Sequence, residues 1–194
     1  MFKKFGQDLI TTNNSSLNVP NALTVFRIFV VPFIIILLYF PGPTTCMLAT
    51  LFFLVAILTD LADGFLARKF NQVTNFGKFL DPLADKILIA SVLVMLVELN
   101  WVSAWVAIII IVREILVTGL RAVAADKGQV IAADKYGKLK TIMQSIALIP
   151  LIYHYPIFGY NIVILGHVLL FTALILTIYS GWNYLYGFYK IWGE

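Results

Sequence analysis

Asp60-Leu-Ala-Asp63-Gly64-Phe-Leu-Ala-Arg68 is followed, after a short connecting run, by Gly77-Lys-Phe-Leu-Asp81-Pro-Leu-Ala-Asp85. Four aspartates therefore lie close together in a chain that is otherwise rich in apolar residues. A carboxylate in a membrane-embedded helix costs roughly 2.5–3.5 kcal/mol, so four cost on the order of 10 kcal/mol unless something compensates. A bound divalent cation compensates directly, because Mg²⁺, Ca²⁺ and Mn²⁺ prefer oxygen ligands. The stretch therefore predicts a divalent-metal site.

Composition places this site in a membrane protein. The chain has 194 residues, of which 61% are hydrophobic, and its mean hydropathy is +0.92. A soluble domain is nearer half apolar, and a spanning helix needs about 20 apolar residues, which leaves room for about six spans. We therefore expect an all-α integral membrane protein with one domain over residues 1–194. Cys46 is the only cysteine, so an intrachain disulfide is impossible.

Apolar runs separated by turn residues predict where these helices lie. Residues 1–15 form an expected interfacial segment, because Phe2, Phe5 and Leu9 follow helical spacing beside Lys3 and Lys4. The predicted spans are about 21–40, 45–68, 77–98, 102–125, 137–155 and 160–189. The aromatic-rich tail Tyr179–Trp192 is interpreted as an interfacial belt, and His154 and His167 as packing or interfacial residues.

Charge predicts the orientation of the spans. With these boundaries, all 14 Lys and Arg residues fall at or toward one side of the membrane. The positive-inside rule then places both termini and the aspartates on the cytoplasmic side. The net charge of +4 suits anionic lipid headgroups and phosphorylated substrates, and it does not indicate nucleic acid.

Helical spacing predicts how the aspartates are arranged. Asp60 and Asp63 are three residues apart, and Asp81 and Asp85 are four apart, so each pair shares a helix face. The short connection makes the two helices antiparallel neighbours, with the pairs facing each other around one or two cations. Pro82 is expected to kink the second helix near its start. A helix-packing role for the aspartates and a cation or proton transporter are the alternatives.

The order D-x2-D-G-x2-A-R-x8-G-x3-D-x3-D resembles the signature of the CDP-alcohol phosphotransferases. In that family an acceptor hydroxyl attacks the metal-bound diphosphate of a CDP-linked donor and releases CMP. The resemblance implies that all four aspartates bind two divalent metal ions, either Mg²⁺ or Mn²⁺. It also implies that Asp85 is the general base. The resemblance further implies a CDP-diacylglycerol site that comprises Asn21, Thr24, Asp60, Gly64, Arg68 and Gly77.

Other segments resemble the bacterial phosphatidylglycerophosphate synthases within that family: Pro20-Asn21-Ala-Leu-Thr24-Val-Phe-Arg27, Arg113-Glu114-Ile, Gly119-Leu-Arg121 and Lys135-Tyr-Gly137-Lys138-Leu-Lys140-Thr141. The implied reaction transfers a phosphatidyl group from CDP-diacylglycerol to glycerol 3-phosphate, giving phosphatidylglycerophosphate and CMP. Arg113 and Arg121 are eight residues apart, close to one helix face, and Lys135 opens the next span. These three, with Arg27, are the expected acceptor-phosphate residues.

The resemblance also implies a homodimer in the bacterial plasma membrane, among membrane lipids, with its active site facing the cytoplasm. An inositol phosphate or phosphatidylglycerol is the alternative acceptor. For Lys138 and Lys140, anchoring at the membrane surface is the alternative to a role in the site.

Overall fold

The structure is a computed structural model that describes residues 19–69, 75–126 and 135–192. Over these ranges the chain forms six α-helices and no β-strand: α1 (Val19–Tyr39), α2 (Pro43–Lys69), α3 (Asn75–Glu98), α4 (Ala104–Asp126), α5 (Lys135–Tyr153) and α6 (Ile162–Trp192). The prediction of an all-α fold is confirmed. The predicted interfacial helix in residues 1–15 lies outside the described residues.

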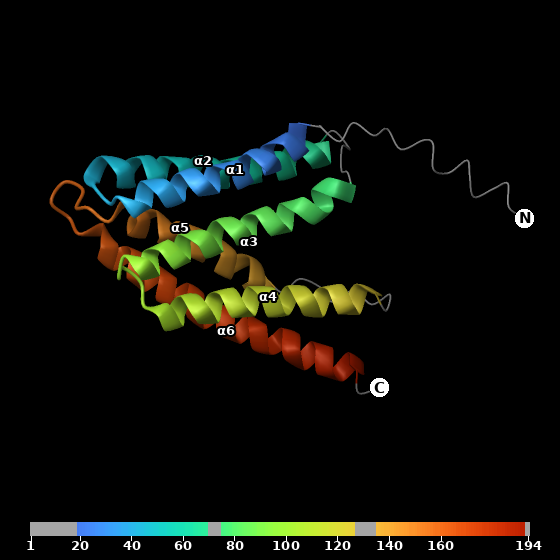
Figure 1. Ribbon diagram of the computed structural model, residues 1–194. Helices are drawn as coiled ribbons and strands as arrows, with labels where there is room; N and C mark the ends of the chain where they lie inside the picture. The colour runs from blue at the N-terminus through green and yellow to red at the C-terminus, as the bar shows by residue number, and fades with distance from the viewer. Residues whose placement is uncertain (1–18, 70–74, 127–134, 193–194) are drawn as a thin grey trace, which may run out of the picture.

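The helices run side by side as a bundle (Figure 1). α1 packs on α2 and α3, α5 packs on α6 and α2, and α4 packs on α6. The start of α1 and the ends of α2, α4 and α6 lie at one end of the bundle, which we call the charged end. The opposite end, where α1 meets α2, α3 meets α4 and α5 meets α6, is the far end. This alternation agrees with the predicted order of crossings.

The bundle is apolar outside as well as inside. On α6, one stripe of exposed side chains comprises Ile164, Val168, Phe171, Ile175 and Ile178. Their spacing of three and four residues puts them on one helix face. Soluble proteins rarely expose so large a continuous apolar surface. The outer surface therefore suits lipid, as expected of a membrane protein.

Within the described ranges, three helices are long and apolar enough to cross a membrane by length and composition: α1 over Asn21–Tyr39, α2 over Pro43–Asp60 and α6 over Ile162–Tyr189. α5 contributes a shorter apolar stretch, Leu139–Tyr153. α3 and α4 carry charged residues toward the charged end, including Asp85 on α3 and Arg121 on α4. These charges lower the apolar content of both helices, so six crossings remain a prediction.

The start of α3 bears on the predicted aspartate geometry. α3 begins at Asn75 and continues through Pro82. Asp81 and Asp85 therefore lie in one helix, as the shared-face argument requires.

Polar contacts close the turns at the far end. Asn100 has a positive φ of 59°, and the Trp101 N–H donates to the Leu96 carbonyl at 2.8 Å, which ends α3 in a Schellman-type turn. The Trp101 and His154 rings stack at a centroid distance of 3.7 Å. The predicted packing role of His154 agrees with this stack.

Candidate active site

Aspartates from two helices meet one arginine at the charged end. Arg27 on α1 is fully buried. Its Nη1 lies 3.0 Å from Oδ1 of Asp60 on α2 and also contacts Oδ1 of Asp85 on α3. A buried guanidinium group is tolerated only with such partners. Arg27 thus links the two aspartate-bearing helices through their carboxylates.

The same face of α1 supplies two further polar side chains. Asn21, Thr24 and Arg27 are spaced three residues apart, which keeps them near one helix face, and all three are buried. The Thr24 hydroxyl donates to Oδ1 of Asp81 at 2.5 Å. α1 therefore packs polar groups against the aspartates inside an otherwise apolar interface.

The carboxylate oxygens of Asp60, Asp81 and Asp85 are ligands that suit a divalent cation. Two of these carboxylates, Asp60 and Asp85, already share the positive charge of Arg27. Among the described side chains, no three His, Cys, Asp or Glu residues lie close enough together to hold a metal ion. The fourth predicted ligand, Asp63, lies outside the described side chains, together with Gly64, Arg68 and Gly77. The complete ligand set therefore remains a prediction.

A cavity of about 730 Å³ adjoins the aspartates, and we call it the cationic cavity. Asp60 lines one part of it. Among the side chains that the structure describes, its other charged lining residues are Lys86, Arg113, Glu114, Arg121 and Lys140, contributed by α3, α4 and α5. Four cations and two acids thus surround one space, which favours an anionic ligand.

A second cavity, of about 510 Å³, shares Lys86, Glu114 and Arg121 with the first. It is also lined by Asp85 and Gln144. The Gln144 side chain is buried, and its Nε2 has no hydrogen-bond partner in the part of the chain that the structure describes. Because buried amides are normally hydrogen-bonded, this donor is suited to a ligand in the cavity.

Contacts within α4 and with neighbouring helices hold three cations of the cationic cavity, Arg113, Arg121 and Lys140. Glu114 pairs with Lys140 and lies 3.3 Å from Nη1 of Arg113. Arg121 donates a hydrogen bond to the hydroxyl of Tyr184 on α6. The expected convergence of Arg113 and Arg121 is observed, since both line the cavity.

Several residues differ in place from their sequence interpretation. Lys140 is buried and paired with Glu114, so it is no surface anchor. Tyr184 is only 3% exposed, so the interfacial-belt interpretation of the tail is wrong for this residue. Arg27 contacts the aspartates and does not line the cationic cavity. The side chain of Lys135 lies outside the described residues.

Lys86 and Gln144 were missed as site residues. Lys86 directly follows Asp85, and its adjacency to the motif is the one signal that could have identified it. Gln144 carries no such signal, because a single glutamine in an apolar helix is equally typical of a packing hydrogen bond.

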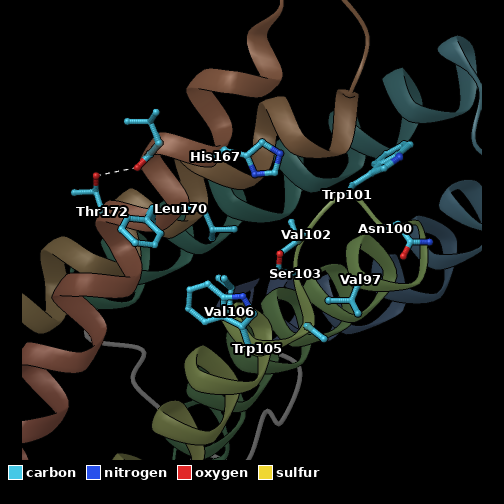
Figure 2. A pocket seen from close by; sticks show the side chains of 13 residues that line it. Val97, Asn100, Trp101, Val102, Ser103, Trp105, Val106, His167, Leu170 and Thr172 are labelled. Atoms are coloured by element: carbon cyan, nitrogen blue, oxygen red, sulfur yellow. Dashed lines mark hydrogen bonds between the residues drawn. The ribbon is translucent and has the colours of Figure 1, made fainter.

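The far end of the bundle holds a larger cavity of a different kind, about 800 Å³ (Figure 2). Figure 2 shows side chains from the end of α3, the α3–α4 connection, the start of α4 and α6 around it, among them Trp105 on α4 and His167 on α6. The described residues that line it include no Asp, Glu, Lys or Arg. This cavity therefore lacks charged groups for binding phosphate or metal, and the reactive groups gather at the charged end.

Comparisons with known proteins agree with this arrangement. Residues 17–179 match the family model described as CDP-alcohol phosphatidyltransferase. The chain is 41% identical to the CDP-diacylglycerol–glycerol-3-phosphate 3-phosphatidyltransferase of Bacillus subtilis, over 90% of this chain and 95% of that protein. It is 42% identical to the Haemophilus influenzae protein of the same name, over 87% of this chain and 91% of that protein. The chain, with its aspartate cluster beside a cationic cavity, therefore belongs to the CDP-alcohol phosphatidyltransferase family.

Proposed function

We propose that this protein transfers a phosphatidyl group from CDP-diacylglycerol to glycerol 3-phosphate, giving phosphatidylglycerophosphate and CMP. One observation carries the proposal: Asp60 and four cations line the same cavity. The aspartates suit a metal-bound diphosphate, and the cations suit an acceptor that bears its own phosphate. The names of the relatives support the same reaction.

At the donor side, the proposed metal ligands are Asp60, Asp63, Asp81 and Asp85. In this proposal they hold two divalent metal ions, either Mg²⁺ or Mn²⁺. These ions would neutralise the charge of the diphosphate and stabilise the CMP leaving group. Asn21, Thr24 and the motif residues Gly64, Arg68 and Gly77 would surround the nucleotide. Asp85 is the proposed general base, because its carboxylate borders the cavity lined by Arg121 and Gln144.

The bond changes follow from this placement. The acceptor hydroxyl oxygen attacks the phosphorus of the phosphatidyl group while its proton passes to the Asp85 carboxylate. The bond from that phosphorus to the CMP oxygen breaks, and CMP leaves with the electron pair.

At the acceptor side, a phosphate monoester would lie among Lys86, Arg113, Arg121 and Lys140, with Lys135 opening α5 nearby. Guanidinium groups bind phosphate through paired hydrogen bonds. Such a pocket favours glycerol 3-phosphate or an inositol phosphate over phosphatidylglycerol, which carries no phosphate monoester. The Gln144 amide is available to an acceptor hydroxyl. Arg27 contacts Asp60 and Asp85 and does not line the cationic cavity, so it is proposed to balance the charge of these carboxylates and not to bind the acceptor phosphate.

Replacing Arg121 with alanine should raise the KM for glycerol 3-phosphate by about 10- to 100-fold. The reason is that a charge-assisted hydrogen bond is worth about 1.5–3 kcal/mol and each 1.4 kcal/mol is about tenfold. The KM for CDP-diacylglycerol should stay unchanged in the same kinetic assay. Arg121→Lys keeps the charge but loses the planar fork, so its effect should be smaller. A higher donor KM with a normal acceptor KM would place Arg121 in the nucleotide site instead.

We propose that the protein is a multi-pass homodimer in a bacterial plasma membrane. Its charged end is proposed to face the cytoplasm. In a Cys46→Ala background, a cysteine at position 127, between α4 and α5, should react with impermeant thiol reagents only in inverted vesicles. A cysteine at Phe158, which is 96% exposed at the far end, should react only from outside. The reverse pattern would overturn the orientation.

A transporter is the competing function for intramembrane acids. Among the described residues that line the far-end cavity there is no Asp or Glu, whereas Asp60 and Glu114 line the cationic cavity. Purified protein should release CMP only when CDP-diacylglycerol, divalent metal and glycerol 3-phosphate are all present. Cation flux in proteoliposomes without acceptor-dependent CMP release would favour transport.

A further inference from the structure

One face of α6 carries polar residues that point inward at the level of the cationic cavity. Ser180 is fully buried and Tyr184 is 3% exposed, although both side chains carry hydroxyl groups. Polar groups are buried at little cost only when they are hydrogen-bonded. Arg113 donates to the Ser180 hydroxyl, and Arg121 donates to the Tyr184 hydroxyl. Each of these two α6 hydroxyl groups therefore accepts a hydrogen bond from one arginine of α4.

The Tyr184 ring adds a second contact to both arginines. Its centroid lies 4.7 Å from Cζ of Arg121 and 5.8 Å from Cζ of Arg113. Both distances lie within the range of cation–π attraction. One buried ring therefore lies close to two guanidinium groups of like charge.

Gly181 of α6 leaves room for the Arg113 side chain. A Cβ atom at this position would lie 3.1 Å from Cγ of Arg113, which is closer than an ordinary van der Waals contact. The absent side chain therefore lets the Arg113 stem pass against α6. Gly187, two turns further along the helix, has no atom within 4 Å of the corresponding position.

We propose that Ser180, Gly181 and Tyr184 are positioning residues that hold the Arg113 and Arg121 guanidinium groups in place for the acceptor phosphate. Long side chains that are fixed before binding lose less freedom when the ligand arrives, so affinity rises without any new contact to it. The inference rests on the proposed function, in which both arginines bind that phosphate. It assigns α6 a role in acceptor affinity and none in donor binding.

The test removes each positioning contact and compares it with a matched control on the same helix. Tyr184→Phe and Ser180→Ala should each raise the KM for glycerol 3-phosphate by about 3- to 10-fold, the range for loss of one hydrogen bond. Gly181→Ala should act in the same direction by displacing Arg113. The donor KM and kcat should stay within about twofold. Tyr186→Phe, at an exposed tyrosine, and Gly187→Ala should leave all three parameters unchanged.

A double-mutant cycle separates positioning from general stabilisation. Adding Tyr184→Phe to Arg121→Ala should not raise the acceptor KM further, because the Tyr184 hydroxyl is proposed to act on the acceptor only through the Arg121 guanidinium group. If Tyr184→Phe raises the acceptor KM by the same factor in the unsubstituted protein and in Arg121→Ala, the inference is overturned. Unchanged acceptor KM values in both Tyr184→Phe and Ser180→Ala while Arg121→Ala is impaired would also overturn it. If Arg121→Ala itself leaves the acceptor KM unchanged, the proposed phosphate site fails, whatever the α6 variants do.

Discussion

Replacing Asp85 with asparagine should lower kcat by about 10²- to 10⁴-fold, the usual contribution of a general base. The amide cannot accept the acceptor proton, and it is a poorer ligand for a hard cation than a carboxylate. Asp85 contacts Arg27 and borders the cavity that Arg121 also lines, so it lies where the proposed donor and acceptor sites meet. The measurement is steady-state CMP release at saturating substrates and metal.

Glu98 provides the matched control for this prediction. It is an acid on the same helix, at the far end of α3, and Glu98→Gln should retain normal kcat. Asp60→Asn and Asp81→Asn should also lose most activity and should require more metal for half-maximal rate. Near-normal turnover of Asp85→Asn at limiting metal would remove this residue from both proposed roles.

The second large effect is expected at Arg27. Arg27→Gln removes the positive group that Asp60 and Asp85 share, and it leaves two neighbouring carboxylates without this counter-charge. Breaking a fully buried ion pair costs 3–5 kcal/mol. The Asp60 and Asp85 side chains are 38% and 43% exposed, so solvent reduces the loss to about 2–3 kcal/mol.

Thermal unfolding of the purified protein in detergent measures this effect. The unfolding temperature of Arg27→Gln should fall, and added Mg²⁺ or Mn²⁺ should restore part of the loss because a bound cation stabilises the folded state. Arg27→Lys should be less affected, since it keeps one positive charge. An unfolding temperature equal to that of the unsubstituted protein, with no response to metal, would show that Arg27 does not balance these carboxylates.

Local patterns explain which features could be predicted from the sequence. Apolar runs and turn residues predict helices whose observed bounds lie close to the expected spans, because the pattern and the helix both depend on nearby residues. The placement of Asp81 and Asp85 on one face follows from the same periodicity. The convergence of Arg113 and Arg121 follows from their spacing of eight residues.

Contacts between distant segments could not be read in this way. The partners of Arg113 and Arg121 on α6 lie more than 60 residues away, and no local signal marks Tyr184 as different from its aromatic neighbours. In a membrane helix, inner and outer faces are both apolar, so hydrophobic pattern does not reveal which tyrosine is buried. Lys140 illustrates the same point, because its burial depends on Glu114 from another helix.

The lipid product tests the central claim most directly. Purified protein would be given CDP-diacylglycerol and divalent metal with glycerol 3-phosphate, an inositol phosphate or phosphatidylglycerol in separate reactions, and the lipids identified by mass spectrometry. We expect phosphatidylglycerophosphate, in equal amount with CMP, from glycerol 3-phosphate and no new lipid from the other two acceptors. A new lipid formed only from one of the other acceptors, or no acceptor-dependent CMP at all, would contradict the proposed function.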